Sequence, residues 1–94
     1  MRLEDVELVG ESGTVIPVID ILVEDVAWPF GDRMGRPVTA RTPSRVHGRL
    51  GAKMTIQRPG GEQLGTFMLT GVSPSLDQGV RSIIYGIQLS DKVK

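Results

Sequence analysis

The sequence predicts an all-β fold: a small, partly open barrel or sandwich of five to seven mostly antiparallel strands, with one long loop or arm at about residues 27–43. Two observations support this prediction. Twelve glycines and six prolines punctuate short runs that are rich in β-branched residues. No stretch has the period of a long amphipathic helix. The length of 94 residues fits a single domain, residues 1–94.

The N-terminal residues contain one clear signal and one ambiguous signal. In the run at residues 3–9, Val6 and Leu8 alternate as in a strand, while Leu3 and Val6 also fit one turn of helix. The Gly-Glu-Ser-Gly sequence at residues 10–13 is typical of a hairpin turn. The turn is therefore expected, and the state of the run before it stays open.

The next run, residues 14–26, is apolar on both faces near its centre, which predicts the central strand of the core. Pro17 cannot donate a hydrogen bond to a neighbouring strand and indicates an edge position or a bulge. A long bent strand shared by two sheets would satisfy both observations.

Residues 27–43 contain three prolines and two glycines without a sustained period, and we expect a loop. Loops longer than about 12–15 residues are uncommon in compact domains and are usually functional or disordered. We therefore interpret this segment as an arm that is held in place by a contact.

The C-terminal half predicts a hairpin and a final strand. The hairpin joins residues 53–57, through a Pro-Gly-Gly turn, to a strand that starts at Leu64 and has a bulge at Gly65. A second loop is expected at residues 71–79. In the last run, apolar and polar residues fall on alternate positions and predict a strand with one wet face. The apolar positions are Ile83, Tyr85, Ile87 and Leu89, and the others are Ser82, Gly86 and Gln88.

Acidic and basic residues occupy separate stretches although the net charge is zero. Such segregation bears on partners and association rather than on fold, because grouped like charges repel until opposite charges neutralise them. The acidic stretch, residues 1–25, has Arg2 as its one basic residue and contains Glu4, Asp5, Glu7, Glu11, Asp20, Glu24 and Asp25. The basic stretch has Asp32 as its one acidic residue and contains Arg33, Arg36, Arg41, Arg45, Arg49, Lys53 and Arg58.

The size and composition favour an oligomer. A chain this short buries only about 60–65% of its unfolded surface and commonly gains stability from disulfides, metals or association. Cysteine is absent, which removes the first route and the commonest zinc sites. The same absence fits a reducing compartment, and no apolar run is long enough to span a bilayer. We therefore expect a cytoplasmic protein without a membrane partner.

Residues suited to catalysis are scarce. His47 has no second histidine or glutamate at metal-ligand spacing, and Ser73 and Ser75 lack the context of a nucleophile. Asp20 lies in an apolar stretch, where a solvent-facing or arginine-paired carboxylate is the ordinary interpretation. We predict that the protein is not an enzyme and has no cofactor, metal site or catalytic residue.

Nucleic-acid binding is an alternative. The basic stretch at residues 33–58 could follow phosphates along a β-barrel. Few aromatic residues are available for stacking, and the chain is neutral, whereas nucleic-acid domains are usually basic. A Gly-x-x-Gly sequence at residues 48–51 resembles the loop of KH domains, but strand and turn signals follow it, and we reject that interpretation.

The long segment combines aromatic, methionine and arginine residues, a mixture that is enriched at interface hot spots. For Trp28 and Phe30, the alternative is that they fold back and plug one end of the barrel, as a small core would favour. The candidate interface residues are Trp28, Phe30, Arg33, Met34, Arg36, Arg41, Arg45 and Arg49.

We predict a non-enzymatic assembly or protein-interaction module that forms a homo-oligomer or joins a larger protein assembly. In the simplest form, the basic arm of one subunit lies on the acidic N-terminal strands of the next, and this contact closes into a ring. Small, Gly-rich, Cys-free all-β proteins with a long arm resemble the ring-forming, connector or capsid-decorating components of tailed phages and related contractile machines. The alternatives are a nucleic-acid-binding barrel and a small inhibitory or regulatory module.

Overall fold

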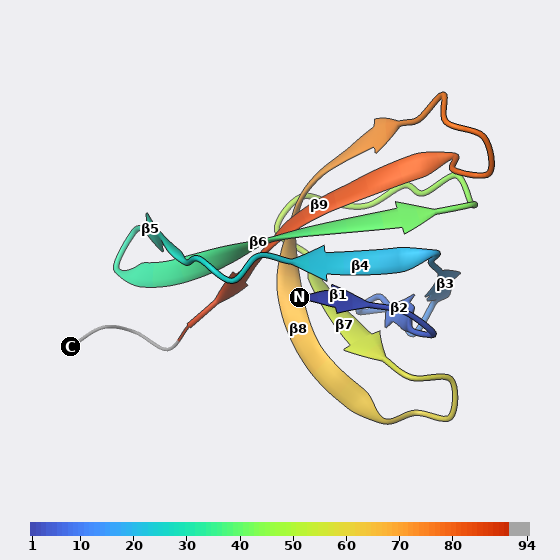
Figure 1. Cartoon of the computed structure of the whole chain (residues 1–94). Coiled ribbons are helices and arrows are strands. Elements are labelled where there is room, and N and C mark those ends of the chain that lie inside the picture. Colours follow the sequence, from blue (N-terminus) through green and yellow to red (C-terminus); the bar gives the residue numbers. More distant parts are fainter. Residues whose placement is uncertain (91–94) are drawn as a thin grey trace.

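The computed structural model describes residues 1–90, and it contains nine strands in one antiparallel sheet (Figure 1). The order in the sheet is β1-β4-β6-β9-β8-β7-β2-β3, and β5 pairs with β6 outside this path. The all-β prediction is confirmed, and the sheet is not closed, whereas the predicted number of five to seven strands is too low because short edge strands and the β5–β6 hairpin were not counted. The strands are β1 (Arg2–Leu3), β2 (Glu7–Val9), β3 (Val15–Pro17), β4 (Asp20–Val23), β5 (Trp28–Phe30), β6 (Arg33–Thr42), β7 (Lys53–Gln57), β8 (Gln63–Pro74) and β9 (Ser82–Leu89).

The core lies on the concave face of the curled sheet. It is built from alternate residues of the strands, because successive side chains of a strand point to opposite faces. Leu8, Ile21 and Ile84 are fully buried and come from β2, β4 and β9, so the core joins both ends of the strand order. This cluster of apolar side chains is what keeps the sheet curled.

Two bulges bend β8, which curves more strongly than the other strands in Figure 1. At the first bulge, Ile56 of β7 is opposite Gly65 and Gln57 is opposite Gln63, which leaves Leu64 as the extra residue. The predicted hairpin and its bulge beside Gly65 are confirmed. The second bulge lies between Leu69 and Gly71 and was not predicted.

The run at residues 14–26 does not form a central strand. It divides into β3, at one edge of the sheet, and β4, which is second from the other edge. Pro17 ends the edge strand β3, as its missing N–H group requires. The run is apolar at successive positions because it supplies two separate strands, β3 and β4, and not because one strand is buried on both of its faces.

Residues 27–43 do not form a loop, and that expectation is wrong. They contain β5 and all of β6, which form a hairpin around Gly31 and Asp32. The carbonyl oxygen of Pro37 accepts a hydrogen bond from the amide of Glu24, so the backbone nitrogen of Pro37 points to the same side of β6 as this carbonyl. On that side the pairing of β4 with β6 has already ended at Val23. The missing N–H group therefore breaks no strand pairing.

The prediction for β9 reversed its two faces. Ser82, Ile84 and Gly86 are buried, whereas Ile83 and Tyr85 point to the outer face. The physical reason lies at Gly86, where a Cβ atom would be 2.1 Å from Cδ2 of Phe67. The absence of a side chain makes room for the Phe67 ring, so a glycine of the polar set belongs to the core.

Residues 1–90 contain no helix that is long and apolar enough to cross a membrane.

Candidate interaction surface

The arm, defined as residues 28–36, is the β5–β6 hairpin end that projects away from the rest of the sheet (Figure 1). Phe30 is paired with Arg33, so only Gly31 and Asp32 form the turn. Gly31 has a φ of 63°, and glycine at the first central position is typical of the two-residue turns that suit hairpins. The turn thus explains why a segment rich in proline and glycine forms strands.

Strand register places several candidate residues on one face. Trp28 is opposite Gly35, and Gly35 is opposite Leu89 of β9. Directly opposite residues share a face of the sheet. Trp28 and Leu89 therefore lie on the outer face, and the alternation along each strand adds the other members of what we call the outer strip: Trp28, Phe30, Tyr85, Ile87 and Leu89.

The aromatic residues of the outer strip are solvent-exposed. Trp28 is 58% exposed, Phe30 is 43% exposed and Tyr85 is 41% exposed. The interpretation in which Trp28 and Phe30 fold back to plug the barrel is therefore wrong. The reason is that the hairpin leads them beyond the curled part of the sheet, where no core is available to cover them.

Basic side chains border the outer strip. Arg33 and Lys53 line a groove of about 270 Å³, and the apolar part of its wall includes Met68, Ile87 and Leu89. Within residues 1–90, neither Arg33 nor Lys53 makes a side-chain ion pair. The groove thus combines an apolar wall with two cations that lack a carboxylate partner in the described part of the chain.

The other two candidate residues of the arm lie on its opposite face. Met34 is 37% exposed, and Arg36 is exposed as well. Both contribute to a second groove of about 500 Å³ with Thr66 and Gln88. The arm therefore presents a different surface on each side, and the sequence did not distinguish the two.

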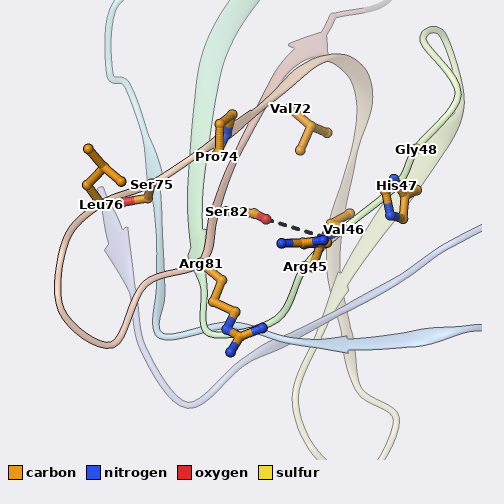
Figure 2. A pocket seen from close by; sticks show the side chains of 10 residues that line it. All are labelled: Arg45, Val46, His47, Gly48, Val72, Pro74, Ser75, Leu76, Arg81 and Ser82. Atoms are coloured by element: carbon orange, nitrogen blue, oxygen red, sulfur yellow. Dashed lines mark hydrogen bonds between the residues drawn. The ribbon is translucent and has the colours of Figure 1, made fainter.

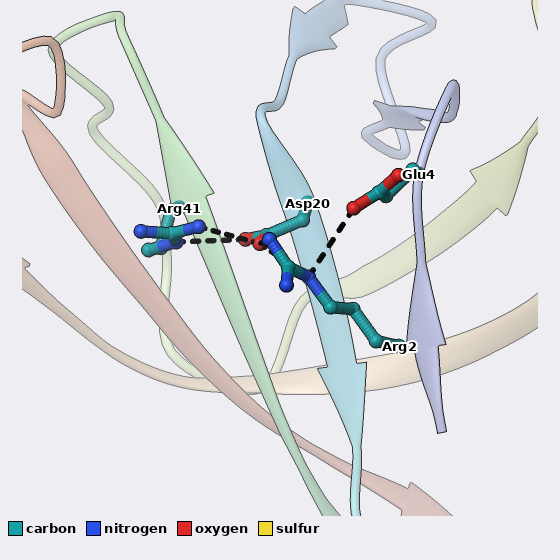
Figure 3. A network of polar contacts seen from close by, with 4 residues as sticks. All are labelled: Arg2, Glu4, Asp20 and Arg41. Carbon is teal, nitrogen blue, oxygen red and sulfur yellow. Dashed lines mark hydrogen bonds and ion pairs between the residues drawn. The ribbon is translucent and has the colours of Figure 1, made fainter.

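Arg41 belongs to a different arrangement (Figure 3). Its Nε donates to Oδ1 of Asp20 at 2.8 Å, and its Nη2 donates to Oδ2 at 2.6 Å. Arg2 reaches the same carboxylate from β1, with Nη2 at 2.7 Å from Oδ2. The network holds β1, β4 and β6 together, so Arg41 stabilises its own chain, and the arginine-paired interpretation of Asp20 is confirmed.

Hydrogen bonds from Arg41 hold the pKa of Asp20 below its ordinary value of 3.8. Burial acts in the opposite direction, and the hydrogen bond from Arg2 also lowers the pKa. The Asp20 side chain is 9% exposed, so its charge depends on these two partners. This group is one place where the basic stretch is neutralised by the acidic stretch within one molecule.

Arg45 and Arg49 lie in the segment between β6 and β7. Arg49 Nη2 is 3.8 Å from Oε2 of Glu11, and both side chains are well exposed. Arg45 lines a cavity of about 790 Å³ at the end of the sheet where β8 turns into β9 (Figure 2). The basic stretch at residues 33–58 is therefore divided among several places: Arg33 and Lys53 share one groove, Arg41 pairs with Asp20, and Arg45 lines a separate cavity.

Side chains suited to metal binding or catalysis are not gathered. In the part of the chain from residue 1 to 90, no three His, Cys, Asp or Glu side chains are grouped to hold a metal ion. His47 lies on the wall of the 790 Å³ cavity, and Ser75 lies across from it. Neither is joined to the other by a hydrogen bond among those residues, so no nucleophile and base are paired.

The sequence patterns missed three features of this surface. Tyr85, Ile87 and Leu89 were interpreted as core residues, and the signal that could have placed them outside was Ile84, which interrupts the polar set. Arg81 lines the 790 Å³ cavity and was not singled out. A Gly-Asp pair between Phe30 and Arg33 was a hairpin signal that would have identified the arm.

No protein-family model, curated protein or solved structure matches this chain. A function must therefore be argued from its geometry and charge.

Proposed function

We propose that this protein is a non-enzymatic interaction module that assembles with copies of itself through the arm and the outer strip. The observation that carries the proposal is the exposure of Trp28 and Phe30 on a projecting hairpin. Tryptophan, tyrosine and arginine are the residues that most often dominate binding energy in interfaces. A small domain needs its large apolar side chains in the core, so their placement outside it favours a contact.

Charge complementarity favours a second copy as the occupant. Arg33 and Arg36 of the arm make no ion pair within residues 1–90, and the same is true of Asp5 and Glu24. Asp5 follows β1 and Glu24 follows β4, so acidic side chains flank the β1–β4 pair. An arm from one copy placed along this pair would bring opposite charges together.

The contact is heterologous, because the arm and the acidic flank of β1–β4 are different parts of the chain. Such a contact closes into a ring when the rotation between copies permits it. A ring-forming component of a phage-like particle would need such a contact, and we include a ring-forming or decorating role in that setting in the proposal. The absence of cysteine is compatible with assembly in a reducing cytoplasm.

The test uses two variants that each lose one half of the contact. Trp28→Ser with Arg33→Glu removes the arm function, and Asp5→Lys with Glu24→Lys removes the acidic flank. Size-exclusion chromatography with light scattering should give a closed oligomer for the natural chain and a monomer for each variant. Because each variant keeps the half that the other lacks, an equimolar mixture should give a dimer with one copy of each.

A matched control is Arg58→Glu, which changes charge in the β7–β8 turn, outside both surfaces. This variant should assemble like the natural chain. If the natural chain is a monomer in low and high salt, the self-assembly proposal fails. If both variants remain oligomers, the contact exists elsewhere, and if the mixture contains no dimer, the contact is not between arm and acidic flank.

A further inference from the structure

The second half of β8 has a free backbone edge. β7 pairs with β8 only as far as Met68, and two backbone hydrogen bonds between Leu69 and residues 51–52 extend the pairing by one step. Within residues 1–90, no backbone hydrogen bond joins residues 70–74 to residues 43–49. β9 covers only the other side of this stretch. The amide of Ser75 donates to Arg81, so by alternation the backbone groups of Val72 and Pro74 point away from β9. Val72 offers an N–H and a C=O group there, and Pro74, which has no N–H, offers its C=O group. These groups are without a strand partner, and such an edge can accept an added strand.

A cavity of about 790 Å³ lies next to this edge (Figure 2). Its walls come from residues 45–48, from Val72 and Pro74 of β8, and from the start of β9. This volume lies within the range of roughly 300–1,000 Å³ that is typical of ligand sites. Because a strand rises about 3.3 Å per residue, the five residues 70–74 offer roughly 13–16 Å of edge.

The charge of the cavity is one-sided. Arg45 and His47 line it from the segment between β6 and β7, and Arg81 lines it from the residue before β9. No carboxylate is among its lining residues, and neither arginine makes an ion pair in the described part of the chain. An occupant that carries carboxylates would neutralise both guanidinium groups, which pair well with carboxylates in bidentate geometry.

The walls are also partly apolar. Val46 and Val72 face the cavity, and Leu76 lies fully exposed at its rim on the β8–β9 loop. An extended segment presents alternate side chains to opposite sides. A segment with carboxylates at alternate positions and apolar residues between them would therefore satisfy the arginines and the valines together.

We propose that the residue 70–74 edge of β8 binds an extended acidic segment of a partner protein as an added strand. Backbone hydrogen bonds supply the affinity in this mode of recognition, and side-chain pockets supply the specificity. The arm of a second copy is a poor occupant, because Arg33 and Arg36 would meet Arg45 and Arg81. This site is separate from the arm and from the acidic flank of β1–β4, and it does not depend on the self-assembly proposed above.

The test measures binding of a short synthetic peptide that alternates glutamate with valine, by fluorescence anisotropy at physiological salt. Two matched peptides serve as controls: one has lysine in place of glutamate, and one has N-methyl groups on alternate backbone nitrogens. We expect binding of the first peptide only. Hydrogen exchange of the wild-type chain should slow at Val72, whose amide points away from β9, when this peptide is added.

Substitutions then locate the site. Arg45→Ala and Arg81→Ala should each weaken binding by about tenfold, the equivalent of about 1.4 kcal/mol. Arg58→Ala removes another exposed arginine, at the β7–β8 turn, and should leave binding unchanged. All three positions are at the surface, and circular dichroism can verify that the variants are folded.

Four results would overturn the proposal. The acidic peptide could fail to bind, or Arg58→Ala could weaken it as much as Arg45→Ala does, which would indicate nonspecific attraction. The N-methylated peptide could bind as well as the acidic peptide, and inorganic phosphate could displace both of these peptides. This result would indicate a simple anion pocket without strand addition. Finally, hydrogen exchange could slow elsewhere in the chain while the amide of Val72 stays unchanged.

Discussion

The two phenylalanines of the chain lie in opposite environments. Phe67 of β8 is 3% exposed and packs over Gly86, whereas Phe30 of the arm is 43% exposed. Both belong to antiparallel strands, so secondary structure does not explain the difference. The two strands differ in whether other side chains of the sheet pack against their apolar face. The body of the sheet curls over itself and buries its apolar face, while the arm extends past the curl and keeps its apolar residues in solvent.

The largest loss of stability is expected for a substitution in the body of the sheet. Phe67→Ala removes a buried ring and leaves a cavity above Gly86, which should lower the free energy of unfolding by about 3–5 kcal/mol. Urea unfolding followed by far-UV circular dichroism measures this loss. Trp28 fluorescence is a poor probe of the transition, because Trp28 is already exposed in the folded chain. A loss below about 1 kcal/mol would show that the curl does not depend on this ring.

The next effect concerns the Asp20 network, which joins three strands of the body. Asp20→Asn keeps the shape but removes the charge that Arg2 and Arg41 share, and it should cost about 2 kcal/mol at neutral pH, since both arginines are half-exposed and screened by water. Glu62→Gln breaks only an exposed pair with Arg58 and should cost less than about 0.5 kcal/mol. Equal losses for the two variants would contradict a special role for Asp20.

The same network predicts a pH dependence. Because the pKa of Asp20 is lower in the folded chain than its ordinary value of 3.8, the network stabilises the fold fully above that value. The stabilisation is lost as the pH falls through the folded-state pKa. The difference in stability between the natural chain and Asp20→Asn should therefore be constant from about pH 7 to pH 5 and shrink below about pH 3.9. A difference that grows on acidification would contradict this sign.

A smaller effect is expected at the junction of arm and body. A Cβ atom at Gly35 would lie 2.3 Å from Cδ1 of Ile87, a side chain of the outer strip that can move. Gly35→Ala should therefore cost about 1 kcal/mol. Gly10→Ala is the control, since its Cβ would have 4.0 Å of space. Trp28 is directly opposite Gly35, so its fluorescence spectrum should shift in Gly35→Ala and stay unchanged in Gly10→Ala.

The smallest effect is expected on the arm itself. Phe30→Ala should change the free energy of unfolding of the monomer by less than about 0.5 kcal/mol, because little apolar surface returns to water. The measurement is the same urea titration as for Phe67→Ala, at a protein concentration low enough to keep the chain monomeric. A loss of more than about 2 kcal/mol would show that the arm supports the fold, and the contrast between the two regions would disappear.

Much of the fold was predictable from residue patterns. The class, the hairpin around the Pro-Gly-Gly turn, the bulge beside Gly65 and the edge position of Pro17 follow from local chemistry. The arm was expected, but its hairpin structure was not recognised, because three prolines and two glycines outweighed the Gly31-Asp32 turn that joins β5 to β6. The faces of β9 were reversed, because Gly86 counts as polar in a pattern although its lack of a side chain admits the Phe67 ring.

The candidate surface was predictable in composition and only partly in geometry. The aromatic and arginine mixture identified the arm as a surface, but the division of Trp28 and Met34 between its two faces depends on register. The cavity beside β8 required segments that are distant in sequence to meet, since Arg45 and Arg81 belong to different loops. Charge along the sequence also overstated the dipole, because Arg41 and Asp20 neutralise each other inside the fold.

The curved strand β8 also affects how the chain acquires its structure. β7, β8 and β9 follow one another in sequence and pair with their neighbours, so this meander closes over short loops. β2 must instead join β7, and the paired strands β4 and β6 must join β9, across long sequence separations, which slows their arrival. We therefore expect the meander to nucleate folding, and the acidic N-terminal strands to add last, at opposite margins of a sheet that already exists.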